Sequence, residues 1–140
     1  DKNLGIICLE QTARTALDAA TALGCSVGAI VKSLLFSTGN SFVLCLVSGD
    51  KRCSLNKLKK ILDEKDVSMA KPDDVKRITG YTIGGVSPVG HINKVKIYID
   101  TNLERFKTVF AAAGHPNCVF KIEFNQLIKL TSGEIKEITE

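Results

Sequence analysis

The stretch that decides the fold of this chain is IVKSLLFSTGNSFVLCLV, residues 30–47. Two apolar runs of strand length, 30–36 and 42–47, flank the segment Ser37 to Asn40, whose glycine and asparagine suit a tight reversal of the chain. The pattern predicts a β-hairpin that packs in the interior of the protein.

Segments with helical and strand periodicity follow one another on both sides of this hairpin. Helices are expected at 12–23, ended by Gly24, at 54–62, after Pro72 and at 124–130. Strands are expected near 67–70, 95–99, 108–112, 118–122 and 134–138. Because strands and helices do not alternate regularly, this order indicates an α+β fold with a mixed or largely antiparallel sheet.

Length and composition are those of one globular domain, expected to span residues 1–140. The chain has 140 residues, of which 44% are hydrophobic and 24% charged. No apolar run approaches the roughly 20 residues that cross a bilayer, so no membrane partner is expected. The sequence starts at Asp1 without a methionine, which suggests that the numbering begins inside a longer gene product.

The cysteines favour a reducing compartment. There are 5, an odd number, with no Cys-x-x-Cys pair. They are expected to be small buried apolar residues of a cytoplasmic protein, with a disulfide framework or a zinc site as the less favoured alternative. The nearest metal-like spacing, His115 to Cys118, offers only two ligands, so no metal and no other cofactor is expected.

The net charge of +4 is modest, but the basic residues are unevenly distributed. One stretch carries basic residues and no acidic ones, and they are Lys51, Arg52, Lys57, Lys59 and Lys60. Such a stretch forms a positive surface that could bind phosphates, and the alternative is a solvated helix face.

Lys32 is unusual because it lies within an otherwise apolar strand. A lysine is almost never buried without a partner, since removing water from an ammonium group costs several kcal/mol. Lys32 is therefore expected to face a cleft, to pair with an acid, or to extend outward to solvent.

A glycine-dense segment, GYTIGGVSPVG at residues 80–90, is too irregular for a helix or a central strand. Glycines allow close approach of the backbone, and successive N–H groups can converge on an anion or a developing oxyanion. The segment matches neither a P-loop nor a dinucleotide fingerprint. The alternative is a connector rich in turns.

Histidine and nucleophile patterns give weaker signals. Gly114-His115-Pro116 places a histidine in a predicted turn, where it could donate a hydrogen bond or accept a proton. The sequence lacks a Gly-x-Ser-x-Gly elbow, a His-Glu-x-x-His motif and a clear Cys-His pair, which disfavours covalent hydrolysis.

Four segments in this order resemble the YbaK/ProX family of free-standing aminoacyl-tRNA deacylases, and they are 30–36, 80–90, 97–100 and 113–116. The family shares its fold with the editing insertion domain of bacterial prolyl-tRNA synthetases. The similarity runs from about Thr12 to the end of the chain. It implies a single α+β domain whose mixed, mostly antiparallel or barrel-like sheet is surrounded by short helices. Val89 departs from the family, in which an aromatic residue is common at this position.

The resemblance implies a role for residues in each segment. Lys32 would meet the polar or phosphate end of the aminoacylated tRNA terminus, while an ordered water attacks the ester and backbone amides stabilise the oxyanion. The implied catalytic residues are Lys32, Gly84 and Gly85. The implied substrate-binding residues are Ser33, Gly80, Ser87, Pro88, Asp100, Gly114 and His115. Asp100 would hold the substrate ammonium group, and the basic stretch 51–60 would contact tRNA phosphates.

The expected function is therefore trans-editing of a mischarged tRNA. The amino acid removed would be small, such as alanine, cysteine or serine, and tRNA-Pro is a candidate carrier. The expected partners are aminoacylated tRNA and an aminoacyl-tRNA synthetase, without DNA. Two alternatives remain at this point: a non-catalytic module that senses an amino acid, a nucleotide or a charged tRNA, and a hydrolase of another small acyl ester.

Overall fold

A computed structural model describes residues 5–9, 15–83, 85–115 and 117–140 of the chain. The predicted hairpin is confirmed: β2 (Val31–Ser37) and β3 (Phe42–Ser48) pair antiparallel, with Lys32 opposite Val47. Two further strands, β5 (Lys96–Asp100) and β8 (Glu134–Lys136), extend the sheet beside β3 in parallel. With β4 (Ser68–Met69) on the other edge, the strand order is β4-β2-β3-β5-β8.

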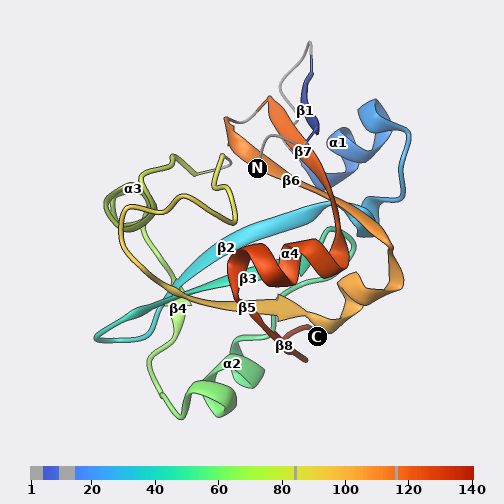
Figure 1. Ribbon diagram of the computed structural model, residues 1–140. Helices are drawn as coiled ribbons and strands as arrows, with labels where there is room; N and C mark the ends of the chain where they lie inside the picture. Colours follow the sequence, from blue (N-terminus) through green and yellow to red (C-terminus); the bar gives the residue numbers. More distant parts are fainter. Residues whose placement is uncertain (1–4, 10–14, 84, 116) are drawn as a thin grey trace.

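A second, antiparallel sheet has the order β1-β7-β6. Its strands are β1 (Gly5–Cys8), β6 (Thr108–His115) and β7 (Cys118–Glu123). It adjoins the first sheet through a parallel bridge between Ile30 and Phe110, and Figure 1 shows β6 and β7 above β2, near the start of that strand. The observed fold confirms the predicted α+β class with mixed sheets.

Four helices in the described part of the chain surround the sheets, at positions close to those predicted. They are α1 (Ala16–Leu23), α2 (Leu55–Leu62), α3 (Pro72–Thr79) and α4 (Phe124–Thr131). The Thr15 and Ser54 side chains cap the first turns of α1 and α2, and Gly24 ends α1 in a left-handed conformation at φ 68°. Short 3₁₀ turns, Val27–Ala29 and Thr101–Arg105, follow α1 and β5.

The alternation of side chains along β3 separates the two larger apolar clusters of the core. Leu44 and Leu46 belong to the larger cluster, which also contains residues of β6, β7 and α4. Val43, Cys45 and Val47 point the other way and pack with Leu58 of α2. The central strand therefore has apolar residues on both faces, which explains its unbroken apolar sequence.

The cysteine prediction was wrong for one pair. Cys8 and Cys118 are directly opposite each other on β1 and β7 and form a disulfide, whereas Cys25, Cys45 and Cys53 are free. β1 was not predicted, and its partner lies 110 residues away along the chain, so local sequence carried no sign of the bond.

Two further observations concern metal ions and membranes. Within the described ranges, no group of His, Cys, Asp and Glu residues is arranged to hold a metal ion. No helix in the part of the chain that the structure covers is long and apolar enough to cross a membrane.

Candidate active site

Lys32 lies where two cavities meet. On one side is an apolar cavity of about 580 Å³, lined by Lys32, Ser33, Ile83, Val86, Phe110 and Val119 among others. On the other side is a basic cavity of about 910 Å³, lined among others by Lys32, Lys51, Arg52, Cys53, Lys59 and Met69. The Lys32 side chain is thus accessible from both cavities.

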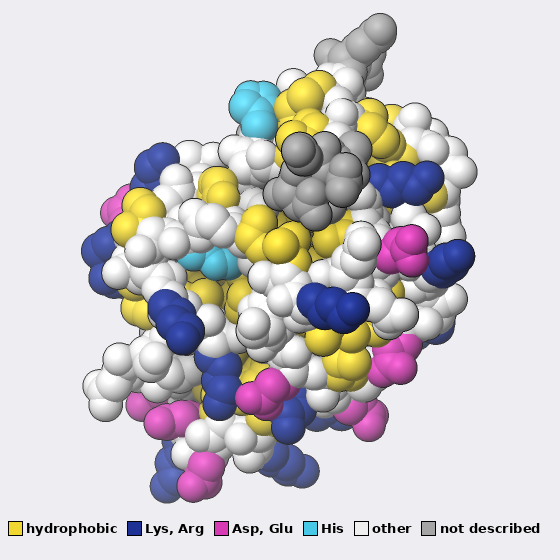
Figure 2. Space-filling view, in the orientation of Figure 1, with side chains coloured by type: hydrophobic (Ala, Val, Ile, Leu, Met, Phe, Trp, Pro, Cys, Tyr) yellow, Lys and Arg dark blue, Asp and Glu magenta, His cyan; other side chains and the backbone are white. Residues whose placement is uncertain are grey.

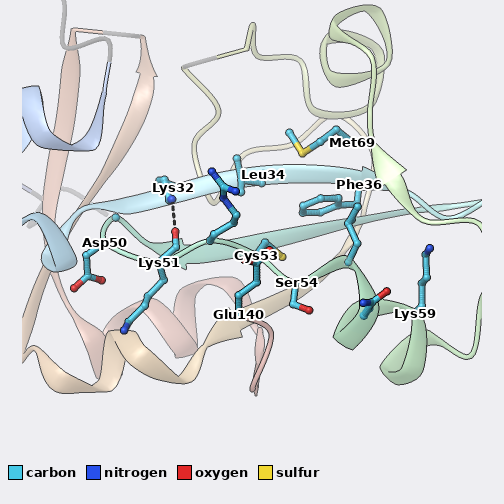
Figure 3. A pocket seen from close by; sticks show the side chains of 14 residues that line it. Lys32, Leu34, Phe36, Asp50, Lys51, Cys53, Ser54, Lys59, Met69 and Glu140 are labelled. Atoms are coloured by element: carbon cyan, nitrogen blue, oxygen red, sulfur yellow. Dashed lines mark hydrogen bonds between the residues drawn. The ribbon is translucent and has the colours of Figure 1, made fainter.

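The Lys32 ammonium group is held by the backbone that follows β3. Its Nζ donates a hydrogen bond to the carbonyl oxygen of Lys51, as Figure 3 shows. Partial burial lowers the pKa of Lys32, and the nearby Asp50 opposes this effect. Lys32 therefore faces a cleft, which is one of the three arrangements that its sequence context predicted.

The glycine-dense segment reaches the apolar cavity through Ile83 and Val86. Gly84, a predicted catalytic residue between them, lies outside the described residues. Gly85 is buried, and its N–H donates to the carbonyl of Thr82 at 3.0 Å, so this amide already has an acceptor. Ser33 lines the same cavity, and its buried Oγ has no hydrogen-bond partner among the described residues.

Ser87 and Pro88 are buried inside the loop and do not belong to the lining of either cavity. The Ser87 Oγ accepts a hydrogen bond from the amide of Val89 at 3.3 Å, and the Ser87 carbonyl oxygen lies 2.6 Å from Nε2 of His91. The Tyr81 hydroxyl donates to the Val89 carbonyl at 2.7 Å. These contacts fix the shape of the loop that carries Ile83 and Val86.

Four predicted substrate-binding residues, Gly80, Asp100, Gly114 and His115, are placed outside the described lining of both cavities. Gly80 ends α3 at φ 84°, and Gly114 has φ 91° next to the Tyr81 ring. His115 is exposed at the end of β6, where its Nδ1 accepts from the amide of Asn117 at 3.1 Å. Both glycines thus have the positive φ that side chains disfavour, Gly80 at the end of a helix and Gly114 at a strand bulge.

Asp100 is fully buried at the end of β5. Its Oδ2 accepts from the Ser48 amide at 3.0 Å, and its Oδ1 accepts from the backbone and side-chain amides of Asn102 at 2.9 and 2.8 Å. The carboxylate therefore accepts its hydrogen bonds from the protein's own amides, and it links the C-terminal ends of β3 and β5.

The structure divides the basic stretch into two groups. Lys51, Arg52 and Lys59 line the basic cavity. Lys57 instead pairs with Glu137 at 3.0 Å and donates to the Thr139 carbonyl at 2.6 Å, and Lys60 is exposed on α2 outside the cavity lining. On the face shown in Figure 2, Lys and Arg gather in the lower half of the molecule, with Asp and Glu among them.

Asp50 and Arg105 brace the turn between β3 and the basic stretch. Arg105 donates to the two carboxylate oxygens of Asp50 at 3.2 and 2.8 Å, and the Ser48 Oγ lies 3.0 Å from the same carboxylate. The Arg105 hydrogen bonds lower the pKa of Asp50. Neither residue was singled out from the sequence, because the two lie 55 positions apart.

The apolar walls of the site were also missed. Phe110 and Ala112 come from β6 and Val119 from β7. The strand period places Phe110 and Ala112 on one face, but only the docking of the second sheet shows that this face borders Lys32.

Comparison with known proteins identifies the family and the fold. Residues 10–130 match the family model described as aminoacyl-tRNA editing domain. The structure superposes on that of a protein provisionally described as a trans-editing enzyme for prolyl tRNA synthetase, with a TM-score of 0.93 and 37% sequence identity. The match covers 98% of this chain and 87% of the other.

Relatives in sequence include a protein matched over most of its length and a ligase matched over a small part of its length. A protein of Enterococcus faecalis, provisionally named Cys-tRNA(Pro)/Cys-tRNA(Cys) deacylase EbsC, is 30% identical over 86% of this chain and 74% of its own length. A proline–tRNA ligase of Fervidobacterium nodosum is 37% identical over 62% of this chain, and the match spans only 15% of the ligase.

Proposed function

Because this chain belongs to the aminoacyl-tRNA editing domain family and is a hydrolase of the aminoacyl-tRNA ester bond, we propose that it removes cysteine from mischarged tRNA-Pro in trans. Alanine and serine are the competing substrates. The observation that carries the proposal is the position of Lys32, between an apolar cavity of about 580 Å³ and a larger basic cavity.

The size of the apolar cavity limits what it can hold. Small-molecule sites have volumes of about 300 to 1,000 Å³, so this cavity suits an amino acid joined to one nucleoside and not a longer piece of tRNA. The rest of the acceptor strand must leave the cavity past Lys32. The basic cavity begins there, and Lys51, Arg52 and Lys59 supply the positive charge that backbone phosphates require.

In the proposed reaction, water attacks the ester carbon, and the bond between that carbon and the ribose oxygen breaks. The products are a free amino acid and a tRNA with a free terminal hydroxyl. Lys32 holds the negatively charged end of the nucleotide next to the reacting ester. A single well-placed donor to the oxyanion contributes about 3 kcal/mol, so a site without a protein nucleophile is sufficient for an ester.

Selection for a small side chain follows from the apolar walls. Phe110, Val86 and Val119 surround the cavity, and a thiol or methyl group is compatible with such surroundings without a dedicated acceptor. A synthetase separates substrates that differ by one small group by only about 10 to 200-fold, so a second, hydrolytic pocket improves fidelity. Prolyl-tRNA synthetase is the proposed functional partner.

The test is release of labelled amino acid from Cys-, Ala- and Ser-tRNA-Pro, with Pro-tRNA-Pro as the cognate control. Lys32→Ala is compared with Lys65→Ala, a matched change at an exposed lysine away from both cavity linings. We expect cysteine release that Lys32→Ala reduces by about 100-fold or more and that Lys65→Ala leaves unchanged. Equal release from all four tRNAs, or full activity of Lys32→Ala, would contradict the proposal.

A further inference from the structure

Two free cysteines lie together at the wall of the basic cavity. Cys53 is half-buried and lines the same cavity as Lys32 (Figure 3). Cys45 is fully buried in the middle of β3, and Cys53 packs against the apolar cluster that contains it. One thiol is therefore accessible from the cavity, and the other belongs to the buried cluster against which it packs.

The two sulfur atoms differ in chemical character. Cys53 packs against the cluster that contains Cys45, so the two thiols influence each other's ionisation. The neighbouring Cys45 thiol lowers the pKa of Cys53, and the Lys32 ammonium acts in the same direction, whereas the neighbouring Cys53 thiol and burial raise the pKa of Cys45. A thiolate is the nucleophilic form of cysteine, so the accessible member of the pair is also the more reactive one.

We propose that Cys53 is a site of reversible oxidation by hydroperoxides, and that Cys45 is the thiol that resolves it into an intramolecular disulfide. In the first step the Cys53 thiolate attacks one peroxide oxygen, the O–O bond breaks, and the leaving alkoxide or hydroxide takes a proton to give an alcohol or water. Cys53 becomes a sulfenic acid.

In the second step the sulfur of Cys45 attacks the sulfur of the sulfenic acid. The S–O bond breaks, and the departing hydroxide combines with the proton of Cys45 to give water. The two thiols together lose two electrons, which the peroxide accepts. A dithiol reductant returns the pair to its original state.

The remaining cysteines provide an internal comparison. Cys25 lies after α1, in a separate apolar cluster with Ala19 and Ile30, and burial raises its pKa. It has neither the neighbouring thiol nor the lysine that Cys53 has. Cys8 and Cys118 are bonded to each other on the second sheet.

Oxidation would alter the wall along which tRNA is proposed to dock, a consequence that rests on the proposed function. Cys53 lies between Arg52 and Ser54 in the cavity lining, next to the Lys32 to Lys51 hydrogen bond. Linking Cys53 to the buried Cys45 draws this wall toward β3. We therefore expect the oxidised protein to show a severalfold higher KM for aminoacyl-tRNA.

The experiment treats the full chain with hydrogen peroxide after mild reduction and maps cysteine peptides by mass spectrometry, with a dimedone probe for sulfenic acid. Wild type should yield a linked peptide containing Cys45 and Cys53. Cys45→Ser should accumulate dimedone on Cys53, Cys53→Ser should yield neither product, and Cys25→Ser should match wild type. Oxidation of Cys25 as fast as Cys53, or wild type without the linked peptide, would overturn the proposal.

The peptide map does not depend on tRNA, so it detects oxidation of Cys45 and Cys53 even if the protein has no deacylase activity. Deacylation by the reduced protein tests the proposed function separately. If the reduced protein is active and its fully linked form keeps the same KM, the link between oxidation and tRNA docking is wrong.

Discussion

At the scale of single residues, Lys32 and Asp100 have contrasting environments. Both are charged residues in strands of the five-stranded sheet. Lys32 keeps part of its surface open to two cavities, whereas the carboxylate of Asp100 is surrounded by N–H donors. The first arrangement suits a group that meets a ligand, and the second suits a group that holds the backbone.

Removing the Asp100 carboxylate should therefore reduce stability. In Asp100→Ala the amide of Ser48 and both amides of Asn102 lose their acceptor, which we expect to lower the free energy of unfolding by about 3 kcal/mol. Urea denaturation measures the difference, and Asp66→Ala, at an exposed aspartate, is the control. An unchanged urea midpoint together with a raised KM would instead favour the predicted contact of Asp100 with the substrate ammonium group.

At the scale of elements, α2 presents its lysines in different directions. A helix turns about 100° per residue, so Lys57 and Lys59 cannot share a face. Lys59 lines the basic cavity, while Lys57 is held by Glu137 and the Thr139 carbonyl. The sequence placed both lysines in one basic stretch, and the helix separates their roles.

Substitution should reveal this separation. Lys59→Gln should raise the KM for aminoacyl-tRNA severalfold and reduce its dependence on salt, because one phosphate contact is lost. Lys57→Gln should leave KM nearly unchanged and cost no more than about 1 kcal/mol of stability, the usual limit for an exposed ion pair. Deacylation kinetics at low and high ionic strength distinguish the two, and equal effects of both variants would show that the lysines act as an undivided patch.

In the glycine-dense segment, too, neighbouring residues have different roles. Tyr81, Ser87 and His91 brace it from within by hydrogen bonds to Val89 and to the Ser87 carbonyl. The polar residues of the segment are thus used to shape it, and its apolar residues Ile83 and Val86 reach the cavity.

At the scale of the whole molecule, Arg105 links segments that are distant in sequence. It bonds to Asp50 after β3 and to the hydroxyl of Ser48, which in turn donates to the carbonyl of Gly28. This network joins the C-terminal end of β3 to the first and the second 3₁₀ turn, where the basic stretch begins.

The network predicts a pH dependence of stability. The pKa of Asp50 is lower in the folded protein than its unfolded value of about 3.9, so its ion pair with Arg105 stabilises the fold above that pH and ceases to do so as the carboxylate is protonated. Both side chains are partly exposed, so Arg105→Ala should cost about 1 kcal/mol or less at neutral pH.

Urea denaturation of wild type and Arg105→Ala at a series of pH values tests this expectation. The difference in free energy of unfolding should shrink as the pH falls below the unfolded pKa of Asp50. A difference that stays constant down to acid pH would show that Arg105 acts by packing on Phe106 and not by its charge.

The sequence alone determined most of the local structure. The hairpin, the helix end at Gly24, the helix that begins at Pro72 and the strand expected at 95–99 depend on periodicity and turn residues within a few positions of one another. The family resemblance, carried by Lys32 and the glycine-dense segment, also originated in the sequence. Which residues of these segments contact substrate stays a prediction.

Only the tertiary structure decided what depends on distant partners. Parallel pairing of β3 with β5, the disulfide between Cys8 and Cys118, and the occupation of Asp100 by Ser48 join segments that no local pattern connects. The division of the basic stretch and the proximity of Cys45 to Cys53 likewise arise from packing against α2 and the C-terminal residues. Local propensity acts within a turn or a strand, whereas a cavity is formed by side chains brought together when the whole core closes.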